Sequence, residues 1–310
     1  PYLPCPPYLP CPPYLPCPPY LPCPQSPVTS YPVPSYPVTS PQSPVPSPQL
    51  PRKMKYHHIG FTPTDLGREP VKIALLSGEP ERSRYIAQNY LQDVKILSEY
   101  RGLYSYLGYL ANGIPILAAT SGIGASSLSI VVNELISVGI EKIIRVGTCG
   151  SIQPHVLVGN IVISQAALCR QGAANDIAPL EYPASADPFL TVALVQAARD
   201  LTINYHLGIT ASVDTFYEGQ ERIASSANPH LLRQLQGVTE DYRNLGILNY
   251  EMEAGTLFKM GGVYNFAAGC VCGVVAQRTV GEDLILENKH LAVETAIKVA
   301  LRAAATIFTD

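Results

Sequence analysis

Residues 142–148 read Lys142-Ile-Ile-Arg-Val-Gly-Thr148, a short apolar run that ends in a glycine and a threonine. Such a run is typical of a buried strand. In the segment before it, 126–138, apolar residues stand at positions 128, 131, 132, 135 and 138, which is helical spacing. A helix followed directly by a buried strand indicates an α/β protein.

The same alternation extends in both directions along the chain. Asn112-Gly113 separates two apolar runs and is typical of a hairpin turn. Strands that alternate with helices predict one α/β domain, with helices packed on both sides of a mixed sheet. The further strands are expected at Val71–Leu76, Tyr104–Leu110, Ile114–Thr120, Val158–Ala166, His206–Ser212 and Ala267–Val275, and the further helices at about 188–201, 251–261 and 288–307.

The first 51 residues have a different composition. They contain no charged side chain and hold 21 of the 30 prolines, beginning with four copies of Pro-Tyr-Leu-Pro-Cys-Pro. Proline lacks the amide donor that helices and sheets need. We therefore expect a disordered or polyproline-II-like tail over 1–53 and the folded domain over 54–310. This tail could be a ligand for proline-binding domains, an inert extension, or sequence upstream of the true start. Met54 is the first methionine, and we hypothesise that translation starts there.

Charge and cysteine usage exclude several classes of function. The net charge is −3 without a Lys/Arg cluster, so no nucleic-acid partner is expected. No apolar run in the proline-rich tail is long enough to be a signal-peptide core or to cross a membrane, and no membrane partner is expected. Cys149, Cys169, Cys270 and Cys272 lie in strand-like runs and are expected to be reduced and buried in a cytoplasmic protein. Cys270-Val-Cys272 alternates faces of a strand, which argues against a metal pair.

One motif offers groups suited to a pyrimidine base. Residues 214–222 read Asp-Thr-Phe-Tyr-Glu-Gly-Gln-Glu-Arg, which sets Gln220 two residues before Arg222 and beside Phe216. A glutamine amide both donates and accepts, whereas an arginine offers only donors in a planar fork. This pair complements the carbonyl–NH–carbonyl edge of uracil. Packing in a core is otherwise the commoner role of an aromatic residue such as Phe216.

Two turns carry an arginine beside a glycine. Residues 77–82 read Ser-Gly-Glu-Pro-Glu-Arg after the first strand, and Arg145 precedes Gly147-Thr148 at what is expected to be a second strand end. Glycine lets backbone amides approach an anion, and arginine adds bidentate donors. Each turn alone fits a plain strand-to-helix turn with a surface arginine. Together with Tyr100-Arg101, they make a phosphate cradle of three arginines plausible.

These motifs and Asn249-Tyr-Glu-Met-Glu253 resemble, in order, those of the uridine phosphorylases of the hexameric nucleoside phosphorylase family. The likeness extends over nearly all of residues 56–305. It implies an α/β domain whose central sheet forms a distorted barrel. It also implies the reversible phosphorolysis of uridine to uracil and ribose 1-phosphate, by a cytoplasmic hexamer built from dimers that share active sites.

The resemblance assigns roles to eleven residues. In the family, the residues that correspond to Arg101 and His58 come from a neighbouring subunit. Two of the residues also have simpler explanations. An adjacent histidine pair such as His57-His58 is usually a surface feature, and a carboxylate near a helix start, such as Glu253, can simply complement the helix dipole. The catalytic groups are Arg145, Arg222 and Gln220. By role the residues are Gly78, Arg82, Arg101, Arg145 and Thr148 for phosphate, Phe216, Gln220 and Arg222 for the base, and His58, Met252 and Glu253 for the ribose.

One part of the family pattern is missing. In bacterial uridine phosphorylases a glutamate follows the interface arginine and helps to bind a monovalent cation, but Gly102 stands at that position here. Ser127 and Ile123 map onto the other members of that site. Without the carboxylate, the cation is not expected. No cofactor is expected either, since inorganic phosphate is a co-substrate.

Three functions remain open from the sequence. Purine phosphorylases of the superfamily carry an aspartate after the penultimate strand, whereas Val275-Ala-Gln-Arg278 is followed by no acid until Glu282. Residues 223–248 resemble the flap-bearing insertion of the pyrimidine branch, so uridine is favoured over a purine nucleoside and over hydrolysis. A nucleoside-binding protein whose proline-rich tail recruits a partner is the non-enzymatic alternative. The sequence does not separate uridine from thymidine or deoxyuridine.

Overall fold

A computed structural model describes residues 55–279, 281 and 289–307 of the chain. The predicted proline-rich tail and Glu282 lie outside these residues, so the domain boundary at 53/54 stays a prediction.

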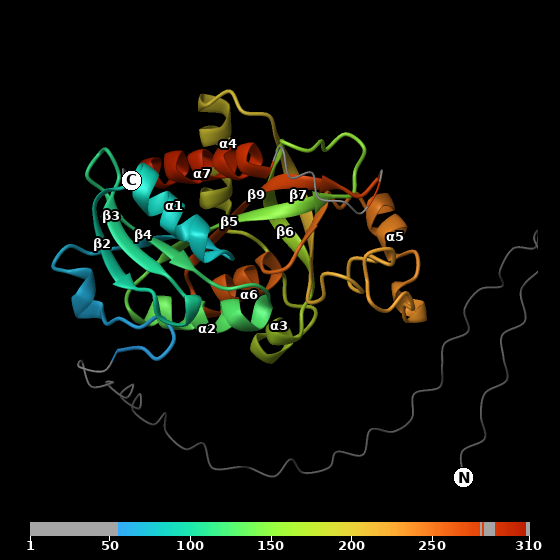
Figure 1. The fold of residues 1–310 in the computed structure, drawn as a ribbon, viewed down its shortest axis with the longest axis horizontal. Coiled ribbons are helices and arrows are strands. Elements are labelled where there is room, and N and C mark those ends of the chain that lie inside the picture. Colours follow the sequence, from blue (N-terminus) through green and yellow to red (C-terminus); the bar gives the residue numbers. More distant parts are fainter. Residues whose placement is uncertain (1–54, 280, 282–288, 308–310) are drawn as a thin grey trace, which may run out of the picture. The chain divides into compact units, whose positions relative to one another are not determined.

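Nine strands of the described chain form one mixed sheet (Figure 1). The predicted hairpin is present as an antiparallel pair, β3 and β4. The predicted strands all occur, with ends that differ by a few residues, and two strands, β2 and the three-residue β8, were not predicted. The strands are β1 (Ile73–Ser77), β2 (Gln92–Ser98), β3 (Ser105–Tyr109), β4 (Pro115–Thr120), β5 (Lys142–Ser151), β6 (Ile161–Arg170), β7 (Tyr205–Val213), β8 (Asn249–Glu251) and β9 (Ala267–Gln277).

One half of this sheet closes on itself. The strand order is β2-β3-β4-β1-β5-β8-β7-β6-β9, and β9 also pairs with β5. The ring β5-β8-β7-β6-β9 is therefore a closed barrel, from which β1, β4, β3 and β2 extend as an open sheet. Parallel pairs (β1 with β4 and β5) and antiparallel pairs (β5 with β8) both occur. The prediction of a mixed sheet with a distorted barrel is confirmed.

Helices cover both faces of the sheet (Figure 1). One layer contains α1 (Pro80–Tyr90), α4 (Pro188–Asp200) and α7 (Lys289–Thr306). The opposite layer contains α2 (Ala125–Ser137), α3 (Gly172–Ile177) and α6 (Ala254–Tyr264), while α5 (Val238–Asn244) lies at the far end of the barrel. Within the described residues, no helix combines the length and apolar character needed to span a bilayer.

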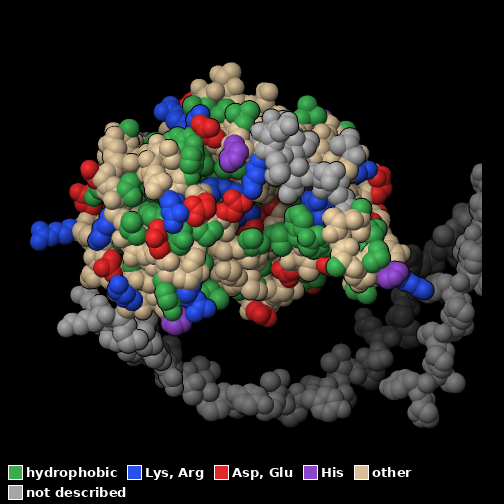
Figure 2. All heavy atoms as spheres, in the orientation of Figure 1, with side chains coloured by type: hydrophobic (Ala, Val, Ile, Leu, Met, Phe, Trp, Pro, Cys, Tyr) green, Lys and Arg blue, Asp and Glu red, His purple; other side chains and the backbone are tan. Residues whose placement is uncertain are grey.

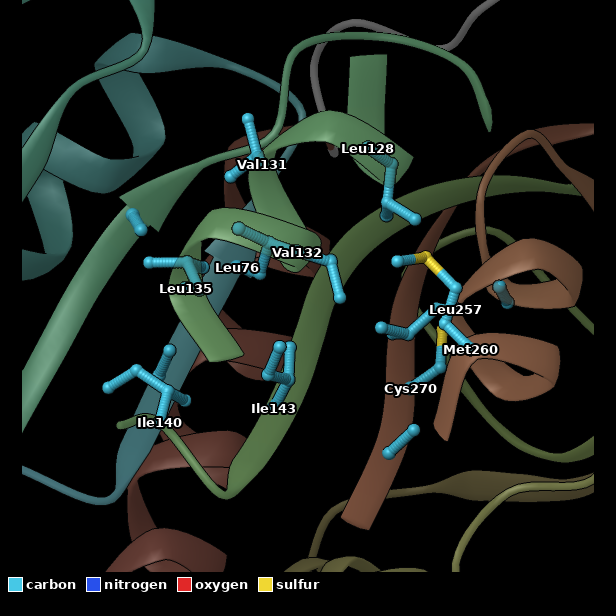
Figure 3. Packing of buried hydrophobic residues seen from close by; sticks show 14 of the residues in the cluster. Leu76, Leu128, Val131, Val132, Leu135, Ile140, Ile143, Leu257, Met260 and Cys270 are labelled. Atoms are coloured by element: carbon cyan, nitrogen blue, oxygen red, sulfur yellow. The ribbon is translucent and has the colours of Figure 1, made fainter. Parts of the chain in front are cut away.

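The alternation of side chains along the strands separates two cores. On β1, Ile73 and Leu75 pack in the cluster that includes α1, α4 and α7, whereas Ala74 and Leu76 pack with α2 and α6. Figure 3 shows the second cluster, in which Leu135 of α2 and Ile143 of β5 are both drawn. Burying each large aliphatic side chain contributes roughly 1.5–3 kcal/mol. The two cores hold the strand ends in place on both sides.

Two predicted positions near the site are wrong in detail. Arg145 does not stand at a strand end, because β5 pairs with β8 and β9 and continues to Ser151. Glu251 does not begin a helix; it ends β8, and α6 starts at Ala254. The Glu251 carboxylate accepts the amide hydrogens of Glu253 and Ala254, both at 2.8 Å, and so satisfies the helix start from outside the helix.

The cysteine predictions hold in part. Cys149, Cys270 and Cys272 are free and buried, as expected, but Cys169 is only partly buried. The expectation that Cys270 and Cys272 alternate faces is wrong, because residues two apart on a strand share a face. Their sulfur atoms lie 3.7 Å apart. Among the described residues, no group of three or more His, Cys, Asp or Glu side chains is arranged to bind a metal.

Candidate active site

A cavity at one end of the barrel collects most of the predicted site residues. Most of its lining comes from four chain segments: the β1–α1 turn, β5, the loop after β7 and the β8–α6 junction. Ile123, Val275 of β9 and Lys289 of α7 (Lys289–Thr306) complete the lining. Nine of the eleven predicted residues are among its lining residues: Gly78, Arg82, Arg145, Thr148, Phe216, Gln220, Arg222, Met252 and Glu253.

At one end of the cavity, an arginine, a glutamine and a phenylalanine form a compact group. The guanidinium carbon of Arg222 lies 4.1 Å from the ring centroid of Phe216. Arg222 Nε donates to Gln220 Oε1 at 3.3 Å, and both polar side chains are buried. Stacking fixes the plane of the guanidinium, so that its remaining donors keep a defined direction.

The backbone of this loop explains why alternate side chains enter the cavity. Glu221 has a φ of 52°, a left-handed conformation that turns the chain sharply between Gln220 and Arg222. Its carboxylate points away and accepts the amide hydrogens of Gly237 and Thr239 at the start of α5. The acidic residue between the two cavity residues thus ties the loop to a helix terminus.

Arg278 supports the same loop from the other side, a role that sequence reasoning missed. Its Nη1 donates to the carbonyl oxygen of Gln220 at 2.9 Å, and its Nη2 to that of Glu221 at 3.3 Å. Arg278 directly follows β9. In the sequence, Arg278 only ends a stretch without an acidic residue, and nothing in a single sequence links it to Gln220 and Glu221, which lie 58 and 57 positions earlier.

At the other end, Arg82 lies in the first turn of α1 and is 5 % exposed. Its Nη1 donates to the carbonyl oxygen of Val146 at 2.9 Å, and its Nη2 lies 3.1 Å from a Glu79 oxygen. Arg82 Nε is buried and has no hydrogen-bond partner within the described part of the chain. Burial lowers the pKa of Arg82, and Glu79 opposes this effect. A buried donor with no acceptor suits a bound anion.

Gly147 makes room for the second arginine of this end. A Cβ atom at Gly147 would lie 2.7 Å from Cys272 Sγ and 2.9 Å from Arg145 Nη2. Contacts this short do not occur for real side chains, so any larger residue would displace the Arg145 guanidinium. This close approach is the reason for glycine at position 147.

Arg145 is held by two carboxylates of the β8–α6 junction. Its Nε donates to Glu251 at 3.1 Å, and its Nη2 forms an ion pair with Glu253. Burial raises the pKa of Glu251 to about 7; Arg145 opposes this rise and Glu253 adds to it. Burial alone would lower the pKa of Arg145, but Glu253 and Glu251 raise it well above its usual range. The network fixes the arginine and the predicted ribose carboxylate together.

The distance between the two ends follows from β5. The guanidinium of Arg145 lies beside Gly147, whereas Gly150 lies beside Arg222, with 3.6 Å between a Cβ placed at Gly150 and Arg222 Nη2. Three residues of strand separate these points by about 10 Å. That length leaves room for a sugar and a six-membered ring between the two arginine groups.

His58 and Arg101 are the two predicted residues that do not line this cavity. His58 Nδ1 lies 2.7 Å from Glu134 of α2, which also accepts the His58 and Ile59 amide hydrogens. Arg101 is exposed and has a φ of 56°. A ring contact between His57 and Tyr100, with centroids 6.5 Å apart, brings the two segments side by side.

The predicted base end contains no carboxylate from β9. Val275 lines the cavity, whereas Gln277 donates to the carbonyl oxygen of Pro154 at 3.2 Å and is not among the lining residues. Tyr250, Glu79 and Lys289 also line the cavity and were not predicted. Of these, Glu79 and Tyr250 stand inside quoted motifs, whereas Lys289 had no motif around it that could have singled it out.

The fold is a mixed α/β sheet with a closed barrel, and its cavity brings together buried arginines from α1, from β5 and from the loop after β7. A family model described as the phosphorylase superfamily matches residues 72–308, so the chain belongs to that superfamily.

Relatives within this family are similar over most of the chain. It is 38% identical to uridine phosphorylase from Salmonella typhimurium and from Escherichia coli, over 81% of this chain and 98% of each relative. It is 37% identical to uridine phosphorylase from Thermococcus kodakarensis, over 76% of this chain and 82% of the relative. A DeoD-type purine nucleoside phosphorylase from a Thermoanaerobacter species is 31% identical, over 80% of this chain and 98% of that protein.

Proposed function

We propose that this protein cleaves uridine reversibly with inorganic phosphate, giving uracil and ribose 1-phosphate. The observation that carries the proposal is the placement of Arg82 and Arg145 at one end of a cavity and Gln220 and Arg222 at the other. The identity to proteins named uridine phosphorylase supports the same reaction. Phosphate would lie against Arg82 and Arg145, beside Gly78 and Thr148.

In this reaction a phosphate oxygen forms a bond to the anomeric carbon of the ribose while the bond from that carbon to the base nitrogen breaks. Arg145 would hold the phosphate, and Glu253, to which it is paired, would accept hydrogen bonds from the ribose hydroxyls with Met252 against the sugar. Holding both reactants in one orientation removes much of the entropic cost of the reaction.

The electron pair of the broken bond passes to the departing base, where negative charge spreads over the ring. Arg222 and Gln220 would stabilise that charge at the pyrimidine edge, with Phe216 packed against the ring. Donors that are already oriented stabilise a developing charge without further rearrangement. Arg278 would hold their loop in place through its two carbonyl contacts.

We also propose that the active site is shared between subunits of a cytoplasmic homo-oligomer, a hexamer built from dimers. His58 and Arg101 lie outside the cavity of their own chain, and their neighbours His57 and Tyr100 are in ring contact, which suits donation of both segments to a partner's site. We propose no cofactor and no monovalent cation, since Gly102 offers no ligand side chain at the position of the family's carboxylate.

One assay tests the reaction and its alternatives. Release of free base is measured from uridine, thymidine, inosine and adenosine, each with and without phosphate. We expect uridine to be cleaved only with phosphate and the two purine nucleosides to be poor substrates. Uridine cleavage that is undiminished in phosphate-free buffer would make the protein a hydrolase, and preferred cleavage of inosine or adenosine would make it a purine enzyme.

A further inference from the structure

Lys289 contacts Glu79, which in turn contacts Arg82 of the proposed phosphate site, although no sequence motif assigns Lys289 to that site. It is the first residue of α7 and lines the same cavity as Gly78 and Arg82. Its Nζ lies 3.5 Å from one oxygen of Glu79, whose other oxygen lies 3.1 Å from Arg82 Nη2. The three side chains form a row of positive, negative and positive charge.

The carboxylate in the middle of this row opposes anion binding. Glu79 directly follows Gly78 and occupies an Arg82 donor that a phosphate could otherwise use. A carboxylate beside an anion site also repels the anion, and a nearby cation offsets that repulsion. The Arg82 side chain is 4% exposed, whereas Glu79 and Lys289 are 44% and 37% exposed. Glu79 and Lys289 therefore have more freedom to rearrange than the arginine does.

The pair also borders a second hollow. Glu79, Arg82 and Lys289 line it together with Tyr85 and Val293. Acidic and basic side chains gather across the middle of the face shown in Figure 2. The Glu79–Lys289 pair thus lies between the cavity and a surface hollow.

We propose that Lys289 is a positioning residue for phosphate use. When phosphate takes the Arg82 donor that Glu79 occupies here, Lys289 holds the displaced carboxylate toward α7 and offsets its charge. This inference rests on the proposed function and adds a residue to its phosphate site. Without Lys289, the Glu79 carboxylate competes more strongly with the substrate anion for Arg82.

Steady-state kinetics on Lys289→Ala tests the proposal. The KM for phosphate should rise roughly three- to tenfold, while the KM for uridine at saturating phosphate stays within twofold of wild type. Lys298→Ala is the matched control, because Lys298 lies on the same helix, pairs with Glu294 at 2.8 Å and does not line the cavity. Lys289→Arg keeps the charge and should keep a phosphate KM close to that of wild type.

The double variant separates positioning from a general loss of structure. Glu79→Gln removes the competing charge, so adding it to Lys289→Ala should return the phosphate KM to within about twofold of the Glu79→Gln single variant. A purely structural role of Lys289 would not be corrected in this way. Calorimetric titration of the full-length variants with inorganic phosphate should give the same order of affinities without turnover.

The outcomes distinguish this inference from the proposed function. If wild type cleaves uridine with phosphate but Lys289→Ala keeps the wild-type phosphate KM, Lys289 has no part in phosphate use. Equal rises in the KM for phosphate and for uridine would also reject the proposal, as would a double variant no better than Lys289→Ala. If wild type does not use phosphate, the proposed function itself fails.

Discussion

The guanidinium of Arg222 lies over the ring of Phe216, with its central carbon 4.1 Å from the ring centroid. The stack joins the hydrophobic and the charged part of the proposed base site in one unit. Truncating the arginine therefore removes a charge-stabilising donor and exposes the ring that it covers.

Arg222→Ala should lower kcat/KM for uridine, because one preorganised donor is lost. The loss of transition-state stabilisation should be roughly 2–4 kcal/mol. The KM for phosphate should change little, since Arg82 and Arg145 remain. Arg302→Ala, an exposed arginine of α7 paired with Asp200, is the control. Wild-type kinetics in Arg222→Ala would place the base elsewhere.

Gly147→Ala should impair phosphate use specifically. The new methyl group would lie 2.9 Å from Arg145 Nη2 and 2.7 Å from Cys272 Sγ, so the guanidinium has to move. We expect a rise in the phosphate KM of about tenfold or more, comparable to loss of a charge-assisted hydrogen bond. Gly172→Ala is the control, because its Cβ would only reach an ordinary 3.6 Å contact with Asp214. An unchanged phosphate KM in Gly147→Ala would contradict the packing described here.

Arg278→Met should weaken uridine binding without removing a group that contacts the base. The side chain would no longer donate to the carbonyl oxygens of Gln220 and Glu221. We expect the KM for uridine to rise roughly tenfold, which corresponds to about 1.4 kcal/mol. The same loop should become more sensitive to proteolysis. If both properties stay as in wild type, the loop does not depend on Arg278.

Glu251 should make stability depend on pH in a specific direction. Burial raises its pKa from the ordinary 4.5 to about 7, so the folded state holds this proton more tightly than the unfolded chain does. The resulting stabilisation is complete below about pH 4.5 and is lost as the pH rises through 7. Between pH 5 and 8, the free energy of unfolding of wild type should fall by roughly 2–4 kcal/mol more than that of Glu251→Gln. Parallel curves for the two proteins would refute the shifted pKa.

Mixing inactive variants tests whether the site is shared between subunits. If Arg101 serves a partner's cavity, Arg101→Ala and Arg222→Ala subunits should complement each other after dissociation and reassembly. Random pairing leaves about one quarter of the sites intact, so about a quarter of wild-type activity should return. His58→Ala mixed with Arg101→Ala should restore the same fraction only if these two residues come from different subunits. Failure of the first mixture would place Arg101 outside the site or within its own subunit's site.

The sequence predicted the alternating pattern of strands and helices because apolar periodicity reports which faces are buried. It located most of the cavity residues because four motifs carry glycine, arginine and glutamate at recognisable spacings. It misplaced Glu251, because a carboxylate that caps a helix from the end of a strand looks the same in sequence as one in the first turn.

Other features depend on contacts between distant segments. Arg278 reaches the loop of Gln220 across the barrel mouth, and Lys289 reaches Glu79 from a different helix. Strand periodicity alone places Cys270 and Cys272 on the same face, so the prediction that they alternate faces was an error of reasoning and not a limit of the sequence. The roles assigned to the individual site residues stay predictions until variants are measured.

The most direct test of the central claim is product analysis of uridine cleavage in phosphate buffer. We predict one ribose 1-phosphate for every uracil released, and no uracil when phosphate is withheld. Free ribose as the sugar product, or uracil release at the same rate without phosphate, would contradict the account.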